Sequence, residues 1–566
     1  MSMAALIFWG RLWPLCWVGL YSWSAAAQAD AEPVATAIRA ELDTLMSTGE
    51  ATIRGARIAM GARLHEFYSL REFRAAWGNA ESQRQLLQAL ADTYHDGLDP
   101  ADYHLPLLQK LATQVAASGA TDALRAQYDV LLTESLLRVA YHLGFGKVDP
   151  ESFDAQWNYG RTLPEADLSQ EIEQAIASGA VYERLSALKP RHYLYERLKR
   201  ELARYRGIDA DGGWPALPAG SALRPGDRGA RVPVLRHRLV RSGDLLEAPV
   251  NDVLVYDAPL VAAVKQYQAR LGLDADAVVG AATIAELNVP VAQRISQLRV
   301  NLDRGRVLLQ DLPDRFVVVN IAGYTVYLVT GQQVTWSARA QVGRAYRRTP
   351  LFRSNISYLV FNPTWTVPPG IIAADILPAA RNDPGSIARR GLRVLGPDGR
   401  ELDPAAIDWS RFRSGHIPYT LRQDSGPSNA LGRIKFMFPN PYLVYLHDTP
   451  SQSLFERAER PFSSGCVRVE RALELAQLVL NDSDGWNQDA IARVVASGQL
   501  RNVTLKTKIP VLLVYWTAWV DAQGLVNFRR DLYGQDAAWE RALNAPFKLR
   551  ARPLFAESSR TTHPSL

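Results

Sequence analysis

The hydrophobic period of this chain changes once, at about residue 315. Before that point apolar side chains return at the three- and four-residue spacing of helices, and after it they alternate. The length of 566 residues exceeds that of one ordinary core, since domains usually hold about 100–200 residues. The sequence therefore predicts a multidomain α+β protein.

Composition narrows the class of protein. The chain is 47% hydrophobic and 22% charged, which is ordinary for globular domains and excludes a disordered chain. The net charge of +6 is modest, and no block of Lys or Arg indicates a nucleic-acid partner. A mildly basic surface and an acidic polymer as partner both remain open.

Residues 1–29 read as a secretory signal. Arg11 is the only charge before Asp30, a Trp-rich apolar run surrounds it, and small residues lead to a predicted cleavage near Ala29. The alternative is an uncleaved segment that tethers the chain to a membrane. No later stretch has the roughly 18 apolar residues of a membrane helix.

The two cysteines are Cys16 and Cys466. Cys16 lies inside the predicted signal, so the mature protein would carry one thiol and no disulfide. Exported proteins usually pair their cysteines or lack them. Cys466 is therefore either a buried inert thiol or a catalytic nucleophile.

Two helical units are expected before residue 315. Residues 30–210 form a helical scaffold, whose clearest helix spans 121–143 and stops at Gly144 and Gly146. Behind a Gly- and Pro-rich linker, residues 220–290 form a small helical unit. The histidines of this half lack the spacing of metal ligands, and no metal site is expected.

The β-rich part is expected to span 315–535, followed by a C-terminal tail at 536–566. Residues 317–321 and 325–329 predict a hairpin that turns at Gly323. Residues 370–425 are irregular, with one helix at 372–381, and are interpreted as an inserted lid because long insertions usually serve function. Helices are expected at 470–480 and near 490–496, and strands at 509–517 and after 521–524.

The chemistry is expected where a strand, residues 443–448, precedes a small-residue turn at 463–466. Alternation puts Tyr445 and His447 on one face of the strand, with the imidazole exposed at its tip. Ser and Gly leave backbone N–H groups free, as an oxyanion hole requires. A thiol of pKa about 8.5 needs a base, which His447 would supply to Cys466. On spacing alone, an inert thiol stays an equal alternative.

This region resembles L,D-transpeptidases with a YkuD-like catalytic domain. Their signature is a His, a gap, then Ser/Thr-His-Gly-Cys, an aliphatic residue and Arg or Asn, and residues 463–468 match it except at Ser464, which stands where His is common. Residues 362–369, 429–436 and 438–440 are similar to the large Gram-negative YcbB-type subgroup. The unit at 220–290 resembles a small three-helix peptidoglycan-binding domain.

The resemblance implies roles for individual residues. Cys466 would be the nucleophile and His447 its base, with the Asp448 carbonyl orienting the ring and the oxyanion held by the N–H groups of Gly465 and Cys466, helped by the region of Ser464. Arg468 either holds a peptide carboxylate or braces the loop, and Trp365 either stacks on substrate or belongs to the core. The substrate-binding candidates are Tyr445, Arg468, Ser463 and Trp365.

The implied reaction joins peptidoglycan stem peptides in a Gram-negative periplasm. A tetrapeptide donor would acylate the thiol with release of D-Ala, and a diaminopimelate amine would accept the acyl group, giving a 3→3 cross-link that shapes the cell wall. No cofactor is implied, and carbapenems would acylate Cys466. The alternatives are an L,D-carboxypeptidase, attachment of a lipoprotein to peptidoglycan by the same site, and a non-catalytic wall-binding protein.

Overall fold

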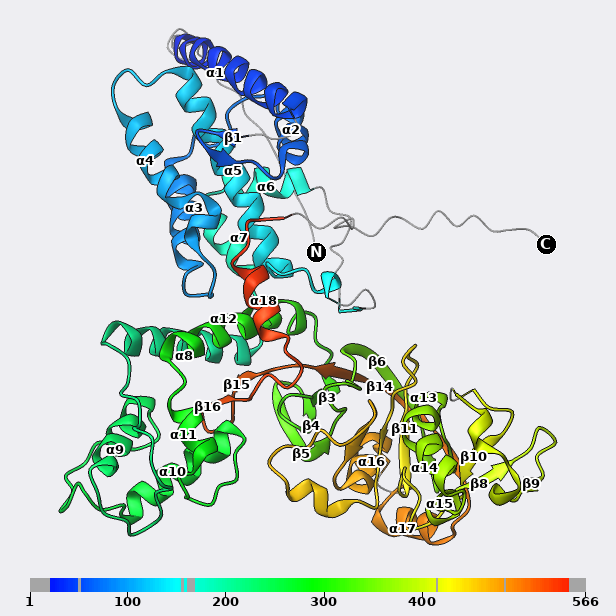
Figure 1. Ribbon diagram of the computed structural model, residues 1–566. Coiled ribbons are helices and arrows are strands. Elements are labelled where there is room, and N and C mark those ends of the chain that lie inside the picture. Colours follow the sequence, from blue (N-terminus) through cyan, green and yellow to red (C-terminus); the bar gives the residue numbers. More distant parts are fainter. Residues whose placement is uncertain are drawn as a thin grey trace, which may run out of the picture.

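The computed structural model describes residues 21–48, 52–153, 157–159, 168–413, 416–482 and 485–548. A helical scaffold, a small helical unit and a β-barrel meet around helices α8 and α12 (Figure 1). Most of the predicted signal segment, with Cys16, lies outside the described residues. Within the described residues, no helix is both long and apolar enough to cross a membrane.

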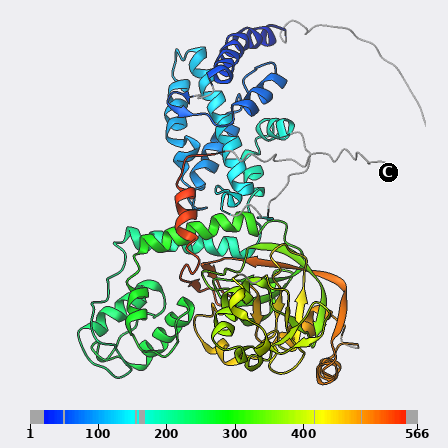
Figure 2. The same ribbon diagram turned by 45° about the vertical axis from the view of Figure 1, so that its right-hand side comes forward.

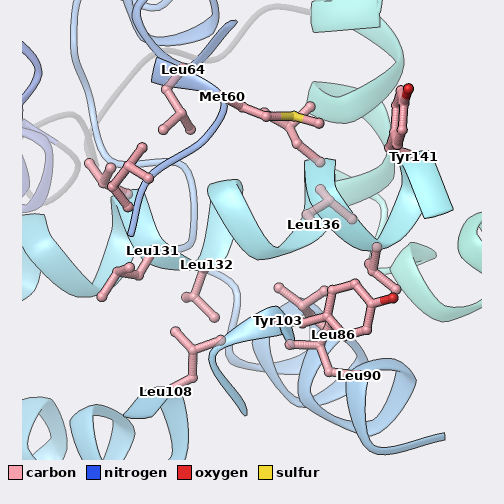
Figure 3. Close-up of a cluster of buried hydrophobic side chains, with 14 of the residues drawn as sticks. Met60, Leu64, Leu86, Leu90, Tyr103, Leu108, Leu131, Leu132, Leu136 and Tyr141 are labelled. Atoms are coloured by element: carbon pink, nitrogen blue, oxygen red, sulfur yellow. The ribbon is translucent and has the colours of Figure 1, made fainter. Parts of the chain in front are cut away.

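The scaffold is built around α5, which is buried on nearly all sides. Thr121 caps its start by accepting a hydrogen bond from Leu124 N at 3.2 Å, and the helix runs through Gly144 and ends before Gly146, whose φ is +79°. Figure 3 shows Leu131, Leu132 and Leu136 of α5 among buried side chains of the neighbouring elements. The scaffold elements are α1 (Tyr21–Thr48), β1 (Thr52–Ile53), β2 (Ala56–Arg57), α2 (Gly61–Leu70), α3 (Ala80–Asp92), α4 (Leu105–Ala116), α5 (Asp122–Phe145), α6 (Leu168–Ala177) and α7 (Val181–Ala187).

Helix α18 (Asp536–Leu543) corrects the expectation of a tail at 536–566. Its Trp539 and Leu543 lie one helical turn apart on one face and are buried in the scaffold core, together with Phe547, which follows the helix. Figure 2 shows α18 standing between the scaffold and α12 (Val291–Leu308), which lies beside α8 (Tyr193–Ala210). Residues from 549 onward lie outside the described part.

The small unit contains the three helices that the sequence predicts, α9 (Arg231–Ser242), α10 (Ala258–Leu271) and α11 (Ala281–Leu287). Arg270 of α10 pairs with Asp244 and donates to Val526 O at 3.0 Å. Val526 belongs to the hairpin of β15 (Ala518–Val520) and β16 (Val526–Phe528), which follows the barrel. These contacts fasten the small unit to the C-terminal part of the chain.

The β-rich part is a closed barrel with the strand order β11-β12-β13-β5-β4-β3-β14-β6. The predicted hairpin is present as β3 and β4, with Val317 paired to Leu328. Apolar side chains fill the interior, and α16 (Ala472–Leu480) and α17 (Gln488–Ala496) pack on it. The strands are β3 (Arg315–Asn320), β4 (Thr325–Thr330), β5 (Gln333–Gln341), β6 (Phe352–Phe361), β11 (Ile434–Met437), β12 (Leu446–His447), β13 (Val467–Val469) and β14 (Arg501–Val514).

The inserted segment is ordered, whereas the sequence suggested an irregular lid. Its helix is confirmed, because residues 369–382 form one helical run of α13 (Pro369–Ile371), a π-helical turn (Ile372–Ile376) and α14 (Leu377–Asn382). Leu377, Trp409 and Leu421 are buried in a core of its own. Its other elements are β7 (Trp365–Thr366), α15 (Gly385–Arg389), β8 (Arg393–Leu395), β9 (Glu401–Leu402) and β10 (Thr420–Gln423). Such short strands carry no readable alternation, which is why the sequence did not reveal them.

Candidate active site

The site lies on the outer face of the barrel, where one row of side chains crosses four strands. Lys435 is paired with His447, His447 with Arg468, and Arg468 with Gln341. Directly paired residues project from the same face of a sheet. The residues between them, such as Leu446 and Val467, point into the barrel core.

His447 is buried, with 4% of its surface exposed, and this corrects the expectation of an exposed imidazole. Its Nδ1 lies 2.5 Å from the backbone oxygen of Asp448, as the sequence interpretation anticipated. A carbonyl only accepts, so Nδ1 carries the proton and Nε2 is the basic nitrogen. Burial, with the nearby charge of Arg468, lowers the pKa of His447 to about 3, so the ring is neutral near pH 7.

Cys466 stands immediately before β13, beside Tyr445. The N–H of Val467 donates to the oxygen of Tyr445 at 3.1 Å, and Sγ of Cys466 lies 4.0 Å from the oxygen of Leu443. Burial raises the pKa of the Cys466 thiol, although the backbone N–H of Tyr445 and the charge of Arg468 act in the opposite direction. The resting pair is therefore a neutral thiol and a neutral imidazole.

The loop between β5 and β6 holds the turn that carries the thiol. The N–H of Ser463 donates to Val342 O at 2.9 Å, and Thr349 Oγ1 donates to Gly465 O at 2.8 Å while accepting from Gly343 N at 2.9 Å. Gly465 has φ +122°, a conformation that favours glycine. The turn is thus fixed on both sides of Ser464.

Tyr533, near the C-terminal end of the described chain, supports the same loop. Its hydroxyl donates to Gly343 O at 2.7 Å and accepts from Thr349 N at 3.1 Å. Its ring stacks on Tyr515 with centroids 5.3 Å apart. The position of the nucleophile therefore depends on a segment far away in sequence.

The expected oxyanion hole needs a correction at Gly465. Its N–H donates to Ser463 Oγ at 3.1 Å and is not free, and Ser463 also bonds the oxygen of Cys466. The N–H of Cys466 has no acceptor among the described residues. Ser463 therefore shapes the turn, and Cys466 N–H is the backbone donor left for an oxyanion.

Ser464 contacts an arginine that the sequence did not indicate. Nη1 of Arg347 donates to Ser464 Oγ at 2.8 Å, and the same guanidinium forms an ion pair with Asp375 of the inserted segment at 2.5 Å. One side chain therefore connects the β5–β6 loop, the nucleophile turn and the insertion. No motif marks Arg347, because its two partners, Ser464 and Asp375, are distant in sequence.

The remaining candidates separate into two groups. Tyr445 lies at the site, with its ring centroid 5.7 Å from that of His447 and 5.6 Å from Nζ of Lys435. Arg468 donates to Gln341 Oε1 at 3.0 Å, also at the site. Trp365 stands in β7 and packs against the core of the insertion, as expected for a core residue rather than one that stacks on substrate. Within the described residues, no group of three His, Cys, Asp or Glu could hold a metal.

Three parts of the chain match models of known protein families. Residues 314–510 match the model described as L,D-transpeptidase catalytic domain, residues 228–287 match "Putative peptidoglycan binding domain", and residues 62–202 match a model described as Scaffold domain. The chain therefore contains a YkuD L,D-transpeptidase catalytic domain and a peptidoglycan-binding domain, as the resemblance implied.

A curated relative is the "Putative L,D-transpeptidase" of Haemophilus influenzae, which is 38% identical over 242 residues, or 42% of this chain and 48% of that protein. The chain thus matches about half the length of that relative. A solved L,D-transpeptidase from Xylanimonas cellulosilytica (residues 123–326) is 17% identical, with 52% of this chain and 99% of that chain covered. Its TM-score against this chain is 0.18.

Proposed function

We propose that this protein is a cysteine L,D-transpeptidase that forms 3→3 cross-links in peptidoglycan. The observation that carries the proposal is the bond from His447 Nδ1 to the Asp448 carbonyl, 2.5 Å long, which leaves Nε2 as a base on the strand next to Cys466. A thiol that is protonated at rest needs such a base when it attacks a carbonyl. The match to an L,D-transpeptidase catalytic domain supports the same chemistry.

In the first step Cys466 attacks the carbonyl of the L-centre that is bonded to the terminal D-alanine of a stem tetrapeptide. Its proton passes to Nε2 of His447, a bond forms between Sγ and the carbonyl carbon, and the carbonyl oxygen becomes an oxyanion. The N–H of Cys466 donates to that oxyanion, with the hydroxyl of Ser464 or Tyr445 as the second donor. Collapse breaks the C–N bond, and the imidazolium returns the proton to the amine of D-Ala, which leaves a thioester.

In the second step an amine on the diaminopimelate side chain of a neighbouring stem attacks the thioester. Nε2 of His447 takes a proton from this amine and gives it to the departing sulfur, which restores the thiol. The product is an amide between two stems. The peptidoglycan-binding domain supports a wall substrate, and we place the reaction in the periplasm, reached through the signal segment at 1–29.

The test incubates the protein with disaccharide-tetrapeptide, beside Cys466→Ala, and follows intact mass and products. An adduct on the wild type alone, with a cross-linked dimer, supports the proposal. An adduct that yields only tripeptide makes the protein an L,D-carboxypeptidase. The absence of any adduct overturns this donor reaction and favours wall binding without catalysis, whereas an adduct that gives neither dimer nor tripeptide favours attachment of a lipoprotein.

A further inference from the structure

Two cations flank His447 without any acidic partner among the described residues. Lys435 and Arg468 lie on either side of His447 in the row that crosses β11, β12 and β13. Neither forms a salt bridge with any residue that the structure describes. Lys435 faces the ring of Tyr445 at 5.6 Å, and Arg468 donates to the neutral side chain of Gln341.

The neighbouring arginines behave differently. Arg433 pairs with Asp448, Arg347 with Asp375, and Arg339 with both Glu456 and Glu470. Carboxylates therefore compensate these three arginines, but neither Lys435 nor Arg468. Arg344, whose charge acts on Arg468, also has no salt bridge among the described residues.

Burial makes this lack of compensation costly. Lys435 and Arg468 are both half-buried, and burial lowers the pKa of each. Nε of Arg468 is buried and has no hydrogen-bond partner in the structure. Buried charges in proteins are normally paired, because the loss of hydration is otherwise uncompensated. Two uncompensated cations on the sheet face that carries Cys466 and His447 are what a site for an anionic ligand requires.

We propose that Lys435 and Arg468 form a subsite that binds the free carboxylate of the leaving D-amino acid. The inference rests on the proposed function and specifies which donors that function accepts. In a tetrapeptide, the terminal carboxylate is separated from the scissile carbonyl carbon by one nitrogen and one α-carbon, so it stays within one strand spacing, about 4.8 Å, of the attacked atom. The two cations occupy strands on both sides of His447, and Arg468 is two residues from the nucleophile on the same face.

The subsite would give the reaction two properties. Donors whose free carboxylate stands one residue beyond the scissile carbonyl would be selected over longer or amidated peptides, because only that carboxylate reaches and compensates both charges. The released amino acid would leave with its carboxylate, which restores the uncompensated state for the next donor. Arg468 thereby holds the carboxylate, which was one of the two roles open for it from the sequence.

The experiment compares a tetrapeptide donor with its C-terminal amide, using the rate of adduct formation on the full chain. The variants are Lys435→Gln and Arg468→Gln. Lys506→Gln is the matched control, because it removes the same charge from an exposed lysine of β14 that pairs with Asp482. Thermal unfolding and alkylation of Cys466 by iodoacetamide establish that each variant is folded with an accessible thiol.

The wild type and Lys506→Gln should prefer the free acid by roughly 10–100-fold, the range expected for charge-assisted hydrogen bonds. Lys435→Gln and Arg468→Gln should lose most of that preference, because the acid slows more than the amide. Both donors also react more slowly, since the charges of Lys435 and Arg468 oppose the rise that burial causes in the pKa of the Cys466 thiol. Equal rates for acid and amide in the wild type, or an equal fall on both donors in the variants, would overturn the subsite. Failure of both donors to acylate the wild type would instead overturn the proposed function.

Discussion

The hydrogen bond between Nδ1 of His447 and the backbone oxygen of Asp448, at 2.5 Å, fixes which nitrogen of the buried ring can act as a base. A carboxylate in that position would favour an imidazolium, whereas a backbone carbonyl carries no net charge. Burial and the charge of Arg468 lower the pKa of His447 to about 3, although the bond to the Asp448 carbonyl acts in the opposite direction.

The first prediction follows from the directions of two pKa shifts, downward for His447 and upward for Cys466. Above about pH 3 the imidazole is neutral, and the pKa of Cys466 is raised, so the free protein holds a protonated thiol at pH 7. The rate of iodoacetamide alkylation should rise about tenfold per pH unit from pH 5 to pH 8, without a plateau, because it follows the thiolate fraction. A plateau across that range would indicate a thiolate–imidazolium pair instead.

The base itself is tested with His447→Gln. Removing a general base typically costs about 10²–10⁴-fold in rate. Adduct formation with tetrapeptide should fall by that amount, while alkylation at pH 9, where thiolate forms without a base, stays near the wild-type rate. If alkylation at pH 9 fell equally, the substitution would have disturbed the position of the thiol rather than the proton transfer.

The brace on the nucleophile turn gives the next prediction. Thr349 is buried, and its hydroxyl both donates to Gly465 O and accepts from Gly343 N. Thr349→Val keeps the shape and leaves two buried polar groups unpaired, which should lower the free energy of unfolding by about 1–3 kcal/mol and slow acylation. Thr349→Ser retains the hydroxyl and is the control. Equal melting temperatures and acylation rates for Val and Ser would contradict the brace.

Local patterns were sufficient for several elements of the fold and for the turn that carries the thiol. The alternation in β3 and β4, the helical period of α5 and the small-residue turn before β13 are all properties of neighbouring residues. The hydrogen bond from Gly465 N–H to the hydroxyl of Ser463 could also be predicted from the sequence, because a Ser hydroxyl commonly accepts from a backbone N–H two residues later. The general rule that Ser- and Gly-rich turns leave N–H groups free predicts the opposite for Gly465.

Other features depend on residues that only the fold brings together. His447 is buried because the segment before β11 folds over the end of its strand, where Gly432 approaches Asp448 so closely that a Cβ would lie 2.6 Å from its carboxylate. Arg433 then pairs with Asp448. Tyr533 supports the nucleophile loop from the far end of the chain, with no local pattern to mark it.

The ion pair between Arg347 and Asp375 should affect activity more than stability. Both side chains are partly exposed, so the pair contributes at most about 1 kcal/mol to the free energy of unfolding. Arg347→Ala also removes the donor to Ser464 and releases the insertion from the nucleophile turn, and misplacement of reacting groups on that scale costs about 10–100-fold in rate. Arg389→Ala, which breaks the exposed pair with Asp383 inside the insertion, is the control. Equal acylation rates in the two variants would leave Arg347 without a positioning role.

The last prediction concerns the inserted segment, interpreted as a lid. Its two ends are adjacent, because Val367 N donates to Leu421 O at 2.9 Å and Thr366 is paired with Arg422. An Asn-Gly turn joining Val367 to Leu421 therefore closes β7 and β10 into a hairpin without the intervening residues, and suits the twist of such a pair.

The shortened protein should fold, since the core of the insertion is distinct from that of the barrel. Iodoacetamide should still alkylate Cys466, but cross-linking of tetrapeptides should fall, because the pair of Asp375 with Arg347 beside the nucleophile turn is gone. Intact mass after alkylation and product analysis measure the two effects. Unchanged cross-linking would end the interpretation of this segment as a lid. Loss of alkylation together with a lowered melting temperature would instead mean that the insertion is needed to hold the nucleophile turn.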